Sequence, residues 1–244
     1  MPYTLSMPST PPTPASPFRL MQLVGPEQGV AFTNLLALSR YFHRKGHAVS
    51  VVGPLSRLQQ EQVTLTRARW VNLPLVKYED AGGRADNARQ LRRLLRNDPV
   101  DLIHCYGLAA AATAVLALPR FGPRPRLVLT LDDLSAYRFT TRQGWAVRRL
   151  LRQFSVLIAA ADSELQALAR VDRGLATRAH LLHFAADVRP ITADFDLARK
   201  RRSLGLRAET AVIGVISPAT LASAWRPSSP PPTASPATSP TSSS

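Results

Sequence analysis

A loop with two glycines is the part of this sequence whose spacing best suits the binding of a charged group. Gly25 and Gly29 bound the turn-like stretch 25–29 (GPEQG), which separates a β-like run at 19–24 from a helical pattern that extends to Lys45. A glycine at the N-terminus of a helix lets a phosphate approach backbone N–H groups, where the helix dipole favours negative charge. Two glycines four residues apart are also common in ordinary turns, so both interpretations stay open.

Two polar residues near the ends of β-like runs serve either a site or only the fold. His104 ends the run 100–104 (VDLIH), where it is either a ligand contact or a hydrogen-bonded structural histidine. Asp133 comes two residues after the run 126–131 (RLVLTL), where it either binds a ligand or caps the next segment. Both interpretations stay open until the neighbours of these side chains are known.

Several enzyme classes lack their signatures in this chain. It contains no nucleophile elbow, P-loop, HExxH or GxGxxG motif, which excludes the standard hydrolase, NTPase, zinc-protease and dinucleotide-binding patterns. Cys105 is the single cysteine, and no Cys/His cluster has zinc spacing, so we expect neither a disulfide, a metal nor a cofactor. A lone cysteine, the absence of a secretory pattern and an apolar run (107–118) too short to cross a bilayer predict a cytoplasmic protein.

The charge balance is strongly basic. The 244 residues include 31 Lys or Arg and 16 Asp or Glu, for a formal net charge of +15. Nearly all the cations are arginine, a bias that GC-rich codon usage produces without selection for binding, so charge alone supports anionic partners only weakly. Basic and aromatic residues do not alternate as in nucleic-acid-binding proteins, and we expect no nucleic acid partner.

Between residues 18 and 217, β-like runs alternate with helical patterns. The β-like runs are at 19–24, 47–52, 67–73, 100–104, 126–131, 155–160 and 178–182. The first helical pattern ends at Lys45, and the others cover 84–96, 108–118, 137–153 and 163–170. Regular alternation of this kind requires right-handed crossovers between parallel strands. The sequence therefore predicts an α/β fold, a Rossmann-like parallel sheet with helices on both faces.

The pattern also predicts the domain boundaries. Residues 1–17 and 223–244 are rich in Pro, Ser and Thr and are expected to be disordered tails. Residues 18–195 form the Rossmann-like domain, and 196–222 contain a linker helix and a buried-type strand at 211–216 (AVIGVI). That strand lacks the neighbours that a parallel sheet needs, which predicts the first strand of a missing second domain.

Six stretches of the chain resemble family-4-type glycosyltransferases in their order and spacing. The longest, 28–52, resembles the opening of that family, in which a glycine-rich loop precedes a long helix and a G-H-x-V-x-V strand. The others are 101–104 (DLIH), 129–133 (LTLDD), Ser163 with Glu164, 181–187 (LLHFAAD) and 204–206 (LGL), which resemble the family's D-x-[IV]-H, [VL]-T-x-H-D, S-E, I-P-N-G-V-D and L-G-L segments.

This resemblance implies one half of a GT-B fold, in which two Rossmann-like domains transfer a sugar from a nucleotide-sugar to an acceptor, usually without a bound metal. The chain resembles the N-terminal, acceptor-side half, truncated at the start of the donor domain. The implied partners are a nucleotide-sugar donor and a sugar or lipid-linked acceptor. The resemblance marks Asp132 and Asp133 as catalytic candidates, and Gly25, Gln28, Gly29 and His104 as substrate-binding candidates.

Two positions depart from the family pattern. Gln28 stands where a second glycine is common, and Asp132 stands where the T-x-H-D segment has its histidine. A neutral imidazole donates a hydrogen bond to a sugar hydroxyl, whereas an ionised carboxylate only accepts one. The resemblance therefore predicts an altered site.

The helical pattern around Trp145 places this tryptophan among arginines. On a helical wheel the apolar stripe consists of Val147, Leu150, Leu151 and Phe154, and the opposite side carries Arg142, Trp145, Arg149 and Arg152. We expect a positive face that either contacts anionic lipid headgroups at the periphery of the inner membrane surface or holds the indole by cation–π contacts.

Two functions of different classes fit these patterns. The first is the acceptor-side half of a glycosyltransferase, inactive alone because the donor domain is missing. The second is a non-catalytic basic module that binds a polyanion, a membrane surface or a partner subunit. A non-functional gene remnant is a third interpretation.

Overall fold

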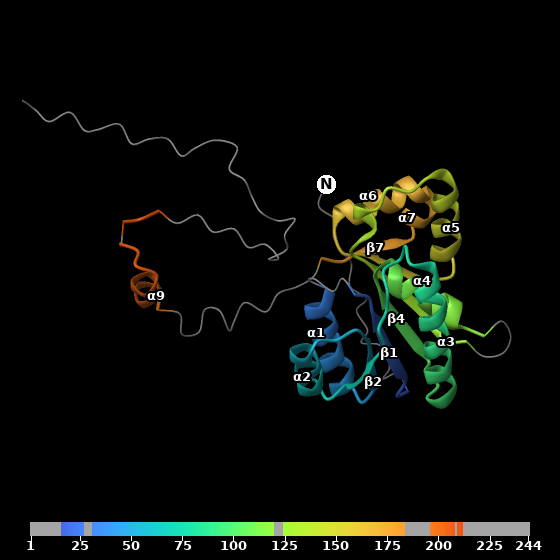
Figure 1. Cartoon of the computed structure of the whole chain (residues 1–244), viewed down its shortest axis with the longest axis horizontal. Coiled ribbons are helices and arrows are strands. Elements are labelled where there is room, and N and C mark those ends of the chain that lie inside the picture. Colours follow the sequence, from blue (N-terminus) through green and yellow to red (C-terminus); the bar gives the residue numbers. More distant parts are fainter. Residues whose placement is uncertain (1–15, 27–30, 120–123, 184–195, 208, 212–244) are drawn as a thin grey trace, which may run out of the picture. The chain divides into compact units, whose positions relative to one another are not determined.

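Seven parallel β-strands form the centre of the first of two units into which the chain divides, Met1–Asp187 and Val188–Ser244 (Figure 1). The structure is a computed structural model that describes residues 16–26, 31–119, 124–183, 196–207 and 209–211. The strands are β1 (Arg19–Val24), β2 (Ala48–Gly53), β3 (Arg69–Asn72), β4 (Leu102–Tyr106), β5 (Arg126–Leu131), β6 (Val156–Ala159) and β7 (Ala179–Leu181). Their order is β3-β2-β1-β4-β5-β6-β7, which is the Rossmann-like α/β fold that the sequence predicts.

The helices cover both faces of this sheet (Figure 1). One face carries α1 (Ala31–Arg44) and α2 (Arg57–Leu65), and the other carries α3 (Ala81–Asn97), α4 (Gly107–Ala117), α5 (Thr141–Leu151) and α6 (Asp162–Val171). This division follows from right-handed crossovers, because the chain moves outward from β1 in one direction and then from β4 in the other. A 3₁₀ turn, η1 (Leu134–Ala136), follows β5, and the short α7 (Arg173–Ala176) follows α6.

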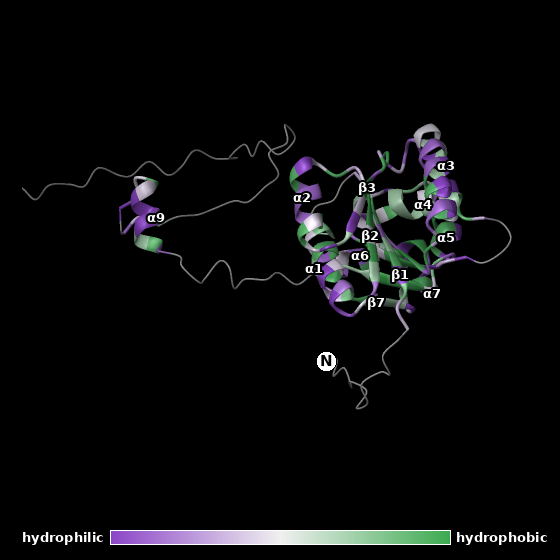
Figure 2. Cartoon of the chain, turned by 90° about the horizontal axis from the view of Figure 1, so that it is seen from below, coloured by the Kyte–Doolittle hydropathy of each residue, from purple (hydrophilic) through white to green (hydrophobic). Residues whose placement is uncertain are grey.

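Each face of the sheet has its own apolar core. Leu35 of α1 and Val51 belong to the core on one face, and Leu91 of α3, Leu129 and Leu151 belong to the core on the other. Figure 2 shows the strands as the most hydrophobic part of this unit and the hydrophilic colour concentrated on the helices. None of the described helices has the length and apolar character needed to cross a bilayer.

The predicted elements match the observed ones with three corrections. The predicted helix at 137–153 is wrong at its start, because Thr140 and Gln143 form a capping box that begins α5 at Thr141. Helices α2 and α7 were not predicted; α2 has little buried surface, and α7 is a single turn. The predicted strand at 211–216 and the tails at 1–17 and 223–244 lie mostly or wholly outside the described residues.

The described part of the second unit contains one helix, α9 (Leu197–Ser203). Asp196 caps it by accepting the N–H of Arg199 at 2.9 Å, and its last turn carries Lys200, Arg201 and Arg202. Gly205 follows with a φ of 66°, a conformation that ends a helix readily when the residue is glycine. The segment 196–222, predicted to contain a linker helix, thus has a helix at Leu197–Ser203.

Candidate functional site

The carboxyl ends of β1 and β4 mark the point where the strand order of the sheet reverses. Val24 pairs with Tyr106 at these ends, and the chain leaves β1 toward one face of the sheet and β4 toward the other. Open α/β sheets bind ligands in the crevice outside such a reversal. Gly25, which follows β1, is buried and lies beside Ala109 of α4.

Gly107 brings the backbone of α4 against an acidic side chain. It has a φ of 77°, and a Cβ atom placed on it would lie 2.9 Å from Oδ2 of Asp133. The carboxylate of Asp133 accepts the N–H of Leu108 at 3.1 Å, in the first turn of α4. Asp133 therefore caps the helix that follows β4, and its side chain makes no capping hydrogen bond to the segment that follows it in sequence.

Asp132 is the most strongly perturbed acid at this edge. Burial is the main cause that raises the pKa of Asp132 to about 7, and the charges of Asp133 and Glu164 act in the same direction. A Cβ on Gly107 would lie 3.5 Å from Oδ1 of Asp132, so both aspartates, which follow β5, lie close to the residue that follows β4. At neutral pH this carboxyl group is protonated in a large fraction of the molecules and then donates as well as accepts hydrogen bonds.

Glu164 completes an acidic cluster from a third element. Its side chain, in the first turn of α6, is 3% exposed and accepts the backbone N–H of Ser135 at 3.2 Å and the hydroxyl of the same serine. These bonds fix η1, and with it the segment directly after Asp133. The described residues contain no group of three or more His, Cys, Asp or Glu side chains arranged to hold a metal ion.

His104 lies inside the sheet rather than at its carboxyl edge. Its Nε2 is 2.8 Å from Oγ1 of Thr130, and its ring stacks on Tyr106 with 4.4 Å between centroids. Burial lowers the pKa of His104 to about 4, so the imidazole is neutral. The hydroxyl of Tyr106 donates to Gln22, whose amide in turn donates to Ser39 of α1. These contacts fit the structural interpretation of His104.

Aromatic and basic residues that the sequence did not mark also line the hollow beside Gly25. Lys77, Tyr78 and Tyr137 belong to this lining, and the two tyrosines meet edge to face with 6.0 Å between centroids. Outside the lining, the guanidinium of Arg84 lies 4.8 Å from the centroid of Tyr78. Burial raises the pKa of the Tyr78 hydroxyl. Tyr78 follows β3, and loops after parallel strands meet at one edge, which is the signal that would have identified it. Gln28 and Gly29 lie outside the described residues.

The family model Glycosyltransferase Family 4 matches residues 32–188. The chain belongs to this family. A glycosyltransferase from Rickettsia africae ESF-5 is similar over 80% of this chain and 51% of that one, with 12% identity and a TM-score of 0.64. Alr3699/HepE from Anabaena, in complex with UDP and glucose, is similar over 77% and 50%, with 17% identity and a TM-score of 0.57. No curated protein matches the sequence.

The similarity to these structures shows the fold of a glycosyltransferase N-terminal domain. UDP-N-acetylglucosamine 2-epimerase from Rickettsia bellii is also similar, with 14% identity, a TM-score of 0.51, and coverage of 79% of this chain and 52% of that one. The chain spans about half the length of each of these structures. The predicted half of a GT-B fold is therefore confirmed at the level of family and fold.

The predicted basic face of this family 4 domain lies on α5, which begins eight residues after Asp133 in the sequence. Trp145 is 63% exposed, and the guanidinium of Arg149 lies 5.7 Å from its ring centroid. Arg142 is exposed beside them. Arg152, however, donates to Asp172 at 3.0 Å, and Arg148 donates to the same carboxylate at 2.7 Å. The single carboxylate of Asp172, distant in the sequence, thus compensates part of the charge of Arg148 and Arg152.

Proposed function

We propose that this domain binds the sugar acceptor of a glycosyl transfer reaction at the carboxyl edge of its sheet. The observation that carries the proposal is the convergence of Gly25, Gly107, Asp132 and Asp133 at the strand-order reversal of a family 4 domain. Asp133 is committed to α4, where it holds the backbone of the site in place. Asp132 is the group available to a sugar hydroxyl.

The protonation state of Asp132 explains how an aspartate serves where the family pattern has histidine. Burial together with the charges of Asp133 and Glu164 raises the pKa of Asp132 to about 7, so its carboxyl group keeps a proton at neutral pH. A protonated carboxyl group donates one hydrogen bond, as a neutral imidazole does. Asp132 orients an acceptor hydroxyl in this protonated form, and the ionised form serves as its proton acceptor.

The donor is a nucleotide-sugar. Alr3699/HepE, which has the same fold over half its length, forms complexes with UDP and with UDP-glucose. In a GT-B enzyme the second domain supplies most donor contacts, and this chain spans about half the length of such structures. The 244-residue chain alone therefore transfers no sugar and binds nucleotide-sugars at best with millimolar affinity. Turnover with UDP-glucose by the purified chain would contradict this part of the proposal.

Glucose is a suitable probe of the acceptor site, followed by NMR shifts of backbone amides. Weak binding at the carboxyl edge shifts the amides of Gly107 and Leu108, and the response decreases as the pH rises through about 7, where Asp132 loses its proton. Asp132→Ala abolishes the response, whereas Asp132→Asn keeps a donor and retains it at every pH. The exposed Asp86→Asn is the matched control. Equal responses in wild type and Asp132→Ala would refute the proposal.

The location of the domain is part of the same proposal. The free, buried Cys105 accords with a reducing compartment, and we place the domain in the cytoplasm with the α5 face toward anionic lipid. Arg142 and Arg149 supply most of the positive charge of that face, since Arg152 shares the carboxylate of Asp172 with Arg148.

A further inference from the structure

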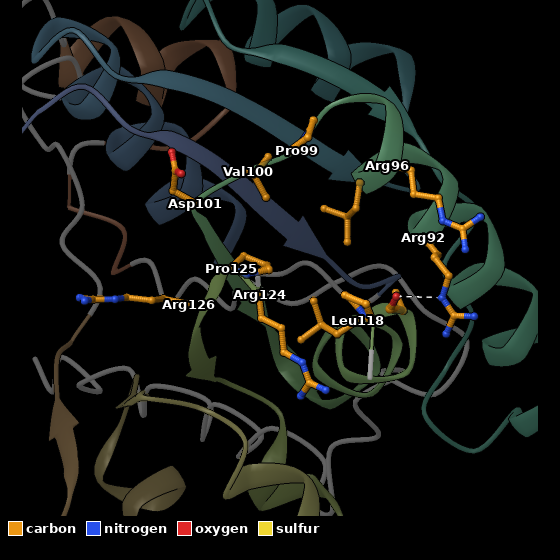
Figure 3. A pocket seen from close by; sticks show the side chains of 12 residues that line it. Arg92, Arg96, Pro99, Val100, Asp101, Leu118, Arg124, Pro125 and Arg126 are labelled. Atoms are coloured by element: carbon orange, nitrogen blue, oxygen red, sulfur yellow. Dashed lines mark hydrogen bonds between the residues drawn. The ribbon is translucent and has the colours of Figure 1, made fainter. Parts of the chain in front are cut away.

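A large hollow lies at the opposite, amino edge of the sheet (Figure 3). Its volume is about 980 Å³, and it is bounded by the C-terminal halves of α3 and α4 and by the segments that lead into β4 and β5. The acceptor site proposed above is at the carboxyl edge, so this hollow belongs to a different part of the domain. Nothing in the proposed transfer reaction uses it.

Four arginines line this hollow, and Arg92, Arg96 and Arg124 stand on two of its sides. Arg92 and Arg96 project from successive turns of α3, and Arg124 projects from the segment before β5 (Figure 3). Arg92 is held in place because it donates to the carbonyls of Ala117 at 3.0 Å and Leu116 at 2.7 Å, at the end of α4. An arginine has five N–H donors, so Arg92 keeps donors for a ligand.

The positive charge of the hollow is not cancelled by the acids near it. The carboxylate of Asp98 is paired with Arg19 and Arg69. The carboxylate of Asp101, which accepts the backbone N–H of Arg19 at 2.7 Å, is one negative charge in a lining that contains four arginines. Within the described part of the chain, Arg96 has no ion-pair partner. The guanidinium groups of Arg92 and Arg96 therefore present positive charge to the hollow.

The surface between these arginines is apolar. Val100, Leu118 and Pro125 occupy the region between the two arginine-bearing sides (Figure 3), and Leu95 of α3 also lines the hollow. Free phosphate would use the arginines but leave this apolar surface in water. A ligand that carries both an oxyanion and a hydrocarbon group satisfies both parts of the lining.

We propose that the amino-edge hollow is a binding site for an anionic amphiphile. A phosphate-type oxyanion is bound by Arg96, Arg124 and the remaining donors of Arg92, and the attached apolar group lies on Leu95, Val100 and Leu118. Guanidinium groups suit such an oxyanion because their N–H groups form paired, charge-assisted hydrogen bonds. The same chemistry is found in the headgroup region of an acidic lipid and in a soluble phosphorylated metabolite with an apolar part.

The full chain tests the proposal with dihexanoyl phosphatidic acid, which is soluble as a monomer, and with inorganic phosphate. Calorimetry is expected to give at least about tenfold tighter binding of the amphiphile than of phosphate. Arg96→Gln and Arg124→Gln, singly and together, weaken the binding, and the double variant loses at least about tenfold. Leu118→Ala weakens the binding of the amphiphile but not that of phosphate, which separates the apolar contribution to the affinity from the contribution of the charge.

A double variant Arg93→Gln, Arg178→Gln is the matched control, because it removes the same charge from exposed positions outside both the hollow and the α5 face. It is expected to bind as the wild type does.

Phosphatidylcholine vesicles with and without phosphatidic acid distinguish the two sources of the ligand. Selective binding to the acidic vesicles that is lost with Arg96 and Arg124 identifies a lipid headgroup. Binding of only the soluble amphiphile identifies a metabolite. Equal affinities for amphiphile and phosphate, or equal losses in the two double variants, overturn the proposal.

Discussion

The two edges of the same sheet carry opposite charges and hold them in different ways. At the carboxyl edge, Asp133 accepts the N–H of Leu108 and Glu164 accepts the N–H of Ser135, so each carboxylate is attached to the backbone of another element. At the amino edge, Arg96 and Arg124 are exposed side chains around a large hollow, and Arg92 donates to a carbonyl at the end of α4.

This difference shows what each edge is suited to do. Buried acids that repel one another cost stability, but their positions are set by the backbone, which is how a site holds a reacting group in fixed geometry. Exposed arginines cost little, because water solvates them, and they attract anions without a fixed geometry. The carboxyl edge is therefore suited to orienting a substrate, and the amino edge to recruiting a charged ligand.

Two glycines with the same backbone conformation test the close packing at the carboxyl edge. Gly107 and Gly46 have φ values of 77° and 84°, but a Cβ on Gly107 meets Asp133 whereas one on Gly46 meets nothing within 4 Å. Gly46→Ala is expected to cost about 1 kcal/mol from backbone strain alone, and Gly107→Ala about 3 kcal/mol because Asp133 must also move. Urea unfolding measures both, and equal costs would show that Asp133 does not constrain this turn.

The pH dependence of stability tests the burial of Asp132. The pKa of Asp132 is about 7 in the folded chain and 3.8 when unperturbed, so between these values the folded state holds a proton that the unfolded state has released. Stability therefore falls as the pH rises through this window, and Asp132→Asn removes the loss. We expect the variant to gain about 2 kcal/mol over wild type between about pH 4 and about pH 8, after allowance for partial solvent contact. Parallel stability profiles of the two proteins would contradict this.

Asp172 provides a contrasting profile. Hydrogen bonds from Arg148, then Arg152 and the N–H groups of Gly174 and Leu175, lower the pKa of Asp172 to about 2. Its contribution is therefore present above the ordinary pKa of 3.8 and is lost as the pH falls toward 2, the opposite direction from Asp132. Asp172→Asn is expected to remove the fall in stability between about pH 4 and pH 2, and to leave unchanged the fall in stability above about pH 4 that Asp132 causes.

At the amino edge, the arginines of α3 are expected to differ in their effect on stability. Arg92→Met removes two hydrogen bonds to the last carbonyls of α4 and should cost about 1–2 kcal/mol in the free energy of unfolding. Arg96→Met, one turn away, should change it by less than about 0.5 kcal/mol. If Arg96 proved as costly as Arg92, the arginines of this edge would be structural rather than available to a ligand.

The α5 face gives the smallest expected effect. Each arginine near an anionic leaflet contributes about 1 kcal/mol, and the pairing of Arg152 with Asp172 leaves Arg142 and Arg149 as the main contributors. Trp145→Ala with Arg149→Glu should therefore reduce co-sedimentation with phosphatidylglycerol vesicles about fivefold at low salt and little at high salt. Arg178→Glu is the control. Unchanged partitioning of the double variant would remove this face from consideration.

Sequence patterns predicted the features of this domain that depend on neighbours along the chain. The apolar runs predicted β1 and β5 with the observed bounds, and the position of Asp133 after β5 marked it as a candidate site residue. Its capping of α4 was not predictable, because Leu108 is 25 residues away and meets Asp133 only when β4 and β5 pair.

The same reason explains the other differences. The positive face of α5 was predicted from the arginines opposite its apolar stripe, but Asp172 reaches Arg152 from the junction of α6 and α7. The pKa of Asp132, which follows β5, depends on its burial and on Glu164 of α6. Electrostatic environments are produced by the assembled sheet, and local periodicity contains little information about them.

The carboxyl group of Asp132 allows the most direct test of the account. Its ¹³C chemical shift, followed by NMR over a pH titration of the full chain, reports its protonation without any ligand. The account predicts a midpoint near 7, and a midpoint displaced toward the ordinary value when Asp133→Asn removes one of the charges that raise it. A wild-type midpoint near 3.8 would contradict the proposal that a protonated aspartate orients the acceptor at the carboxyl edge.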